Sequence, residues 1–138
     1  MEAVFQLFLA TFLGALIGLE REIKRREAGL QTYSLVALGS CLFTMITLSL
    51  AKSNIVDPSP IILAIAAGMG FIGAGAIFRG ENQIQGLTTA AGLWATAAIG
   101  LAVGVGIELF YFFAIVGTFL VLLILSGFGL LEKKFLNK

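Results

Sequence analysis

The chain has 138 residues, of which 59% are apolar and only 12% are charged, and its formal net charge is +1. Soluble domains carry roughly a quarter of charged residues, so this chain has too few polar side chains to cover a surface exposed to water. The composition therefore excludes an ordinary soluble domain, and we expect no nucleic-acid partner.

Histidine is absent and cysteine occurs once, as Cys41. The chain therefore lacks the commonest metal ligand and proton shuttle, and it cannot form an internal disulfide. The sequence also holds no Ser/His/Asp set, no Cys/His pair and no cluster of metal ligands. We expect Cys41 to be a packing residue, and we expect no cofactor and no enzymatic activity.

Five uncharged segments follow one another, each of about the 20 residues that a helix needs to cross the hydrocarbon core. They are Ala3–Leu19, Ala28–Ala51, Pro58–Phe78, Asn82–Ile107 and Leu109–Leu131. Buried helices of a soluble protein would not repeat this length five times. We therefore predict an all-α, polytopic bundle of about five transmembrane helices, forming a single domain over residues 1–138. The predicted spans are about 3–19, 33–51, 60–78, 87–104 and 108–131.

The first segment runs directly into the charged sequence Glu20-Arg21-Glu22 and has no basic residue before it. It is therefore predicted to be a retained span and not a cleaved signal peptide. Glu20 lies four residues before Lys24, a spacing that favours a helical extension into the cytoplasm. We expect Gly29 to end this extension in a left-handed conformation.

Basic residues are distributed unevenly between the two sides of the predicted bundle. If the connections alternate sides, eight of the nine Lys and Arg residues share the side of the first and third connections and the C-terminus, and Lys52 alone is on the other. Cytoplasmic loops of membrane proteins carry the excess of Lys and Arg. The N-terminus is therefore predicted to lie outside and the C-terminus in the cytoplasm.

The third segment contains GMGFIG (68–73), which matches the G-x-G-x-x-G pattern of dinucleotide-binding folds. Such a site needs a preceding strand and an acidic residue about 20 positions later. Here an apolar run precedes the glycines, and positions 88–92 read Thr-Thr-Ala-Ala-Gly. We interpret the glycines as a surface for close helix packing, and predict that this span lies centrally. Gly70→Leu or Gly73→Leu should then disrupt assembly more than Phe71→Leu.

Small residues recur in other segments, where GxxxG spacing allows two helix backbones to approach closely. The alternative, a broken helix that lines a binding site, stays open. The glycines predicted to pack are Gly14, Gly18, Gly68, Gly70, Gly73, Gly75, Gly100 and Gly104.

Four sequence blocks resemble the signature blocks of the MgtC/SapB family of membrane proteins. They are GALIGLERE (14–22), AGLQTYSLVALGSCLF (28–43), GMGFIGAGAIF (68–78) and IQGLTTAAGLWATAAIGLAVGVG (84–106), in the family's order. The chain departs from the family pattern at Gln31 and Pro60, where members often carry a basic residue. Many members also carry an ACT-like cytoplasmic C-terminal domain, which we do not expect in this chain.

The resemblance implies a multi-pass protein of the bacterial inner membrane that is connected with magnesium limitation and, in some pathogens, with virulence. It further implies restraint of the F-type ATP synthase through contact in the membrane, without demonstrated magnesium flux.

The uncharged segments carry no Asp, Glu, Lys or Arg, and a charge at the centre of a membrane costs on the order of 3 kcal/mol and usually marks an ion pathway. Thr88 and Thr89 open the fourth span, where the positive end of a helix attracts an anion or a partner's carboxylate. We expect a cytoplasmic interaction patch of Glu20, Arg21, Arg25, Thr32, Arg79, Thr88 and Thr89. Glu20 and Glu81 are weak candidates for a magnesium site, and pairing with neighbouring arginines is the favoured alternative.

Two functions are compatible with these features. The first is a regulator whose cytoplasmic patch contacts another membrane complex, such as the F-type ATP synthase. The alternative is a transporter or channel for magnesium or another small solute, built at a homodimer interface. Besides the lipid bilayer, we expect a second copy of the chain as a partner, because short polytopic proteins often cannot enclose a site alone.

Overall fold

The structure is a computed structural model that describes residues 2–80 and 83–136, with side chains described as far as Gly127. The helices in these residues are α1 (Glu2–Ile23), α2 (Leu30–Lys52), α3 (Ile61–Gly75), α4 (Leu87–Val105) and α5 (Glu108–Leu136). Between α3 and α4, the short strands β1 (Phe78–Arg79) and β2 (Ile84–Gln85) pair in an antiparallel hairpin. The prediction of an all-α membrane bundle is confirmed, because α1, α2, α4 and α5 are long and apolar enough to span a bilayer.

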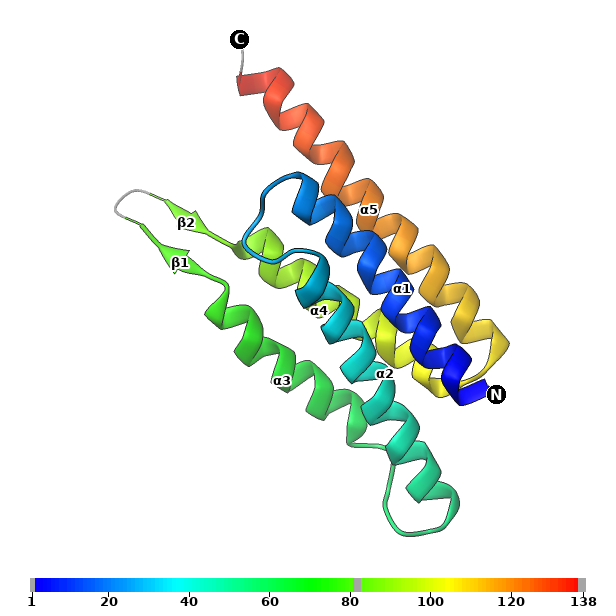
Figure 1. Ribbon diagram of the computed structural model, residues 1–138. Helices are drawn as coiled ribbons and strands as arrows, with labels where there is room; N and C mark the ends of the chain where they lie inside the picture. Colours follow the sequence, from blue (N-terminus) through cyan, green and yellow to red (C-terminus); the bar gives the residue numbers. More distant parts are fainter. Residues whose placement is uncertain (1, 81–82, 137–138) are drawn as a thin grey trace.

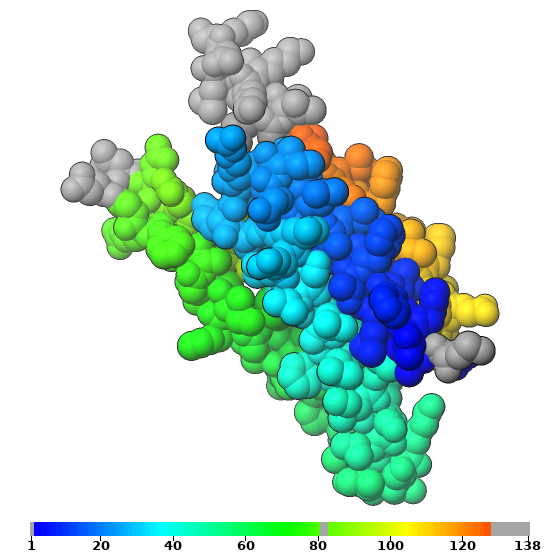
Figure 2. All heavy atoms as spheres, in the orientation of Figure 1, coloured from blue at the N-terminus to red at the C-terminus, as the bar shows by residue number. Residues whose placement is uncertain are grey.

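The helices run up and down, so that successive connections alternate between the two ends of the bundle (Figure 1). The α1–α2 loop and the hairpin lie at one end, and the start of α1 and the α2–α3 loop lie at the other. Figure 2 shows the α1–α2 segment (blue) and the hairpin segment (green) at that shared end. Arg25 and Arg79 lie in these two connections, so we call this end the basic end. Its placement in the cytoplasm remains a prediction.

Helix α4 is the centre of the bundle and contacts the four other helices. It approaches α2 closely because glycines face that helix. A Cβ on Gly104 would lie 2.6 Å from the carbonyl oxygen of Cys41, and a Cβ on Gly100 would overlap the carbonyl oxygen of Ala37. Helix α1 approaches α2 in the same way, since a Cβ on Gly14 would lie 2.6 Å from the carbonyl oxygen of Tyr33. Close backbone contact among α1, α2 and α4 therefore forms the core.

Helix α3 is peripheral, and the prediction that residues 60–78 form a central span is wrong. A Cβ on Gly68, Gly70 or Gly75 would meet no atom within 4 Å, whereas one on Gly73 would lie 3.4 Å from Ala90 Cβ. The helix has 15 residues, and its length of about 22 Å is shorter than a hydrocarbon core of about 30 Å. Glycines make a helix surface able to pack closely, but they do not determine whether a neighbour fills the space.

The first connection also differs from the prediction. Helix α1 ends at Ile23, and the residue with left-handed backbone is Arg25 (φ 52), whereas Gly29 has φ −121. Gly29 instead lies against the side chain of Glu22, whose carboxylate accepts a hydrogen bond from the N–H of Leu30 at 3.0 Å. A Cβ on Gly29 would overlap that carboxylate. The glycine is therefore required for close approach at the start of α2.

Gln6 links α1 to α4 at the end opposite the basic end. Its side-chain amide is buried and donates to the carbonyl oxygens of Val103 (3.0 Å) and Gly104 (3.3 Å) in the last turn of α4. Carbonyl groups in a last helical turn have no partner within the helix. The Val103 oxygen also accepts from the backbone N–H of Gly106 at 3.2 Å, so the amide adds a second donor there and supplies a donor to Gly104.

We expect Gln6→Leu to lower the free energy of unfolding by about 1–2 kcal/mol, because both carbonyl oxygens lose the hydrogen bond from the amide and only Val103 keeps a second donor, the N–H of Gly106. Denaturation of the purified protein in detergent measures this loss. Thr11→Val is the matched control on the same helix, since the Thr11 hydroxyl donates only to Leu7 of its own helix, at 2.7 Å. Equal losses in the two variants would show that the amide of Gln6 has no special role.

Candidate functional site

At the basic end, Thr89 of α4 is hydrogen-bonded to two other helices, α1 and α2, and to the loop between them. It lies in the first turn of α4 and is buried. Its hydroxyl accepts a hydrogen bond from Arg21 Nη2 (3.3 Å) in the last turn of α1, and donates to Glu27 Oε2 (2.9 Å) in the α1–α2 loop. The Tyr33 hydroxyl on α2 donates to the Thr89 carbonyl oxygen at 3.4 Å. We call Arg21, Glu27, Tyr33 and Thr89 the Thr89 cluster.

Glycines bring the members of the Thr89 cluster together. Gly18 lies one turn before Arg21, and a Cβ there would lie 2.7 Å from the Cα of Leu30, so α1 and the start of α2 are in direct contact. Gly92 lies one turn after Thr89, and a Cβ there would lie 2.6 Å from the Tyr33 hydroxyl oxygen. Because Gly18 and Gly92 have no side chains, Arg21 and Tyr33 can reach the start of α4 inside the bundle.

A second set of charges connects α1 to α5 beside the cluster. Lys24 forms an ion pair with Glu20 and donates to the carbonyl oxygen of Leu125 at 2.8 Å. Ser126 donates to Glu20 Oε1 at 3.4 Å. The other oxygen of Glu20 lies 3.8 Å from Arg21 Nη1 and has no hydrogen-bond partner, although it is buried.

Arg21 is the most deeply buried charged residue of the described side chains, with 2% of its surface exposed. One of its side-chain nitrogens, Nε, is buried and has no hydrogen-bond partner. A buried guanidinium with a free donor is costly unless an acceptor is supplied. The site therefore has unused capacity for an acceptor.

The carboxylate of Glu27 is the anion that the structure places at the start of α4. Hydrogen bonds from its own backbone N–H and from the Thr89 hydroxyl lower the pKa of this carboxyl, and the charges of Arg26 and Arg21 act in the same direction. Glu27 is therefore ionised at neutral pH. Its negative charge is favourable beside a helix N-terminus, which carries a partial positive charge.

The structure divides the predicted interaction patch into two groups. Arg21 and Thr89 are buried and hydrogen-bonded to each other, with Glu20 next to them. The remaining patch residues are exposed at the same end of the bundle: Arg25, Thr32, Arg79 and Thr88. The exposed group can contact a partner directly, whereas the buried group holds the helices beneath it.

Sequence reasoning missed Glu27 and Tyr33, and it noted the spacing of Lys24 from Glu20 without including Lys24 in the patch. Tyr33 carries a usable signal, because a tyrosine in an apolar helix needs a hydrogen-bond partner for its hydroxyl. Glu27 carries none, since its contact with Thr89 joins residues 62 positions apart.

The two weak candidates for a metal site do not form one within the described residues. Glu20 is already paired with Lys24, and Glu81 lies outside the described residues. No group of three or more His, Cys, Asp or Glu side chains that could hold a metal ion occurs in the part of the chain that the structure describes.

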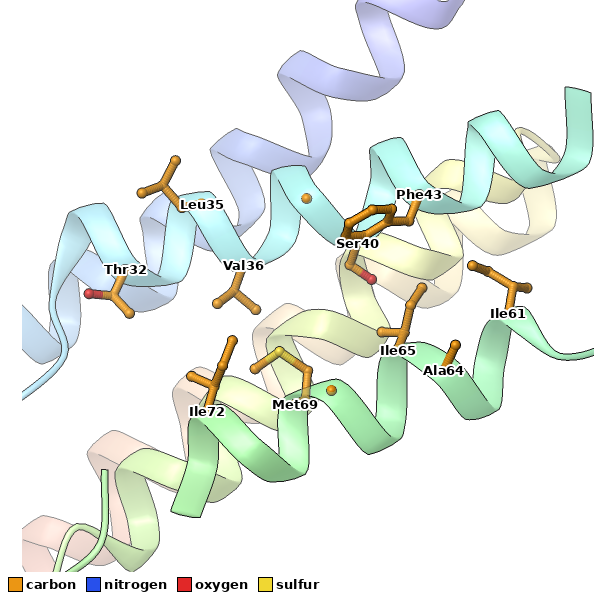
Figure 3. A pocket seen from close by; sticks show the side chains of 12 residues that line it. Thr32, Leu35, Val36, Ser40, Phe43, Ile61, Ala64, Ile65, Met69 and Ile72 are labelled. Atoms are coloured by element: carbon orange, nitrogen blue, oxygen red, sulfur yellow. The ribbon is translucent and has the colours of Figure 1, made fainter. Parts of the chain in front are cut away.

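A cavity of about 590 Å³ lies between α2 and α3. Side chains from both helices point into it, including Val36 from α2 and Ile65 and Met69 from α3 (Figure 3). Its lining is almost entirely apolar, and the hydroxyl of Ser40 donates to the carbonyl oxygen of Ala97 at 2.6 Å. The cavity thus resembles a lipid-facing groove more than a path for a hydrated ion.

Comparison with known proteins gives a consistent result. Residues 7–134 match the family model described as the MgtC family. Protein SrpB of Synechococcus elongatus is 41% identical over 94% of this chain and 76% of its own length. The protein named "Putative magnesium transporter YhiD" of Escherichia coli is 40% identical over 99% of this chain and 65% of its own. Protein MgtC of Salmonella typhimurium is 42% identical over 75% of this chain and 43% of its own. The chain thus spans only part of the length of these relatives, and no solved structure matches it.

Proposed function

The chain belongs to the MgtC family, and from this membership we propose that it is an inner-membrane protein linked to magnesium limitation that regulates a membrane partner through its basic end. The link to magnesium is supported by the name of the relative YhiD. The F-type ATP synthase is the partner that we propose first, as part of the adaptation that also serves virulence in some family members.

The observation that supports this proposal most is that the basic end combines buried residues, which join helices, with exposed arginines. Arg21 and Thr89 are buried and join α1 to α4, whereas Arg25 and Arg79 are exposed in the two neighbouring connections. A rigid network beneath exposed arginines is suited to present positive charge to an acidic surface of another protein. Because long-range attraction between charges steers association, such contacts weaken as salt concentration rises.

Transport is the second candidate, and the name of YhiD is what favours it. Within the described residues, the charged side chains of α1 and α2 lie near the helix ends, α4 carries none, and the α2–α3 cavity is apolar. A magnesium ion retains several waters and needs oxygen ligands. A path for it would therefore require an interface between copies of the chain, and we propose a homodimer in that case.

The proposal predicts that Arg25→Glu and Arg79→Glu together reduce the amount of co-purified membrane partner by at least about tenfold. Both side chains are exposed, so the variant should keep the unfolding free energy of the parent to within about 0.5 kcal/mol. Cross-linking in native membranes followed by purification measures the partner. Lys52→Glu, which reverses a charge at the opposite end, is the matched control.

Two results would contradict the proposal. One is an unchanged amount of partner in the double reversal variant. The other is magnesium entry into liposomes that contain only this protein, recorded with an enclosed magnesium-sensitive dye and compared with empty vesicles. The second result would favour transport.

A further inference from the structure

The start of α4 has no side-chain cap. The residue before its first turn is Gly86 (φ 86), which offers no side chain to accept hydrogen bonds from the first-turn N–H groups. The first four N–H groups of a helix have no partner within the helix and, with the helix dipole, attract anions. Helix starts of this kind bind phosphate groups in many proteins. This property alone does not make a binding site.

Arg21 supplies the second, independent feature. Its guanidinium is 2% exposed, donates from Nη2 to Thr89 in the first turn of α4, and has a buried Nε with no hydrogen-bond partner. The planar guanidinium presents donors in a fork that matches the oxygens of phosphate. The helix start and the arginine therefore offer donors at the same place, and one donor of the arginine is unused.

The carboxylate of Glu27 lies beside the Thr89 hydroxyl at the start of α4, but Glu27 itself belongs to an exposed loop. Its side chain is exposed and belongs to the six-residue loop 24–29, in which Arg25 has left-handed backbone. Its contact with α4 is the hydrogen bond from the Thr89 hydroxyl. If Glu27 moves into water, two cations (Arg21 and Lys24) remain beside one anion (Glu20), so the vacated position carries a net positive charge.

The position of the site indicates the kind of anion. Arg21 lies in the last turn of one apolar helix of spanning length and Thr89 in the first turn of another, so the site lies at the boundary between hydrocarbon and water. Phospholipid phosphates lie at this depth in a bilayer, and anionic lipids are attracted to basic residues there.

We propose that the Thr89 cluster is a binding site for a phosphate group, that of an anionic phospholipid, and that the carboxylate of Glu27 holds its place until the lipid displaces it. Arg21 and the N–H groups at the start of α4 receive the phosphate oxygens, and Glu27 turns outward with its loop. The site then couples lipid composition to the conformation of the α1–α2 loop. It does not depend on the identity of any protein partner.

Native mass spectrometry of the purified full chain in detergent tests this proposal, with phosphatidylglycerol, phosphatidylcholine and inorganic phosphate added separately. We expect phosphatidylglycerol to be retained at least about threefold more than phosphatidylcholine. Glu27→Gln keeps the shape of the displaced side chain but removes its charge, and should raise phosphatidylglycerol retention about three- to tenfold. Thr89→Val and Arg21→Lys should lower it. Glu108→Gln, an acidic residue at the opposite end, should change nothing.

The arms of this experiment separate the possible results. If inorganic phosphate is retained and displaces phosphatidylglycerol, the ligand is free phosphate at the same site. If Glu27→Gln and Glu108→Gln retain phosphatidylglycerol equally, the proposal is overturned, and this outcome does not depend on the folding of buried variants because Glu27 is exposed.

Discussion

Gly100→Ala is expected to destabilise the bundle by about 3 kcal/mol or more, whereas Gly70→Ala is expected to be neutral or to stabilise it by up to about 1 kcal/mol. The added methyl group is the same, and both glycines lie inside helices. At Gly100 the new Cβ would overlap the carbonyl oxygen of Ala37, a backbone atom that cannot turn aside. The overlap can be removed only if α2 and α4 move apart, and this movement weakens the contacts between the two helices.

At Gly70 the new methyl group would meet no atom within 4 Å. Alanine there gains the intrinsic helix preference that glycine lacks, without any steric cost. Thermal unfolding of both variants in the same detergent, followed by circular dichroism, measures the contrast. Similar losses at the two positions would mean that α3 is packed against another surface through Gly70, and would contradict its peripheral place.

The helices could be predicted from the sequence because each of them depends on the residues within its own segment. Uncharged runs of spanning length predicted α4 at 87–104, and the structure has it at Leu87–Val105. Helix α1 continues past residue 19, the end of the predicted span, as the predicted helical extension requires, but it ends at Ile23 and does not reach Gly29. The alternation of connections between two ends follows in turn from the up-and-down order of the helices.

The place of each helix in the bundle could not be deduced in the same way. Both α3 and α4 contain several glycines, yet those of α4 face α2 and those of α3 mostly face open space. Which small-residue surface is filled depends on the competition among all five helices for neighbours. A pattern within one segment holds no information about that competition.

The candidate site was predictable only in part for a related reason. Arg21 and Thr89 each follow from a position at a segment end, and the structure joins them by a hydrogen bond. Glu27 reaches Thr89 because α1 and α2 approach closely at Gly14 and Gly18, and because the backbone turns at Arg25. A contact that depends on both a helix approach and a loop conformation leaves no pattern in the sequence.

Arg21→Met is expected to lower the free energy of unfolding by about 2–3 kcal/mol, because it removes a buried charged hydrogen-bond donor and leaves neighbouring groups unpaired. Methionine nearly matches the length of the arginine stem, so the loss reports the charge more than the packing. The variant leaves the Thr89 hydroxyl without its donor, and it leaves the buried oxygen of Glu20 without the nearby positive charge. Lys24 still pairs with the other oxygen of Glu20, which keeps the cost below that of isolating a charge completely.

The double variant Arg21→Met/Glu20→Gln distinguishes a charge effect from a packing effect. If the cost of Arg21→Met arises from a stranded carboxylate, neutralising Glu20 should recover about 1 kcal/mol, so that the double variant is less destabilised than the sum of the single variants. Arg25→Met, at an exposed arginine four residues away, should change stability by no more than about 0.5 kcal/mol. Urea or guanidinium unfolding in one detergent gives all four values. Strictly additive losses would show that Arg21 acts through its apolar stem alone, and the buried charges would then contribute nothing to holding α1 against α4.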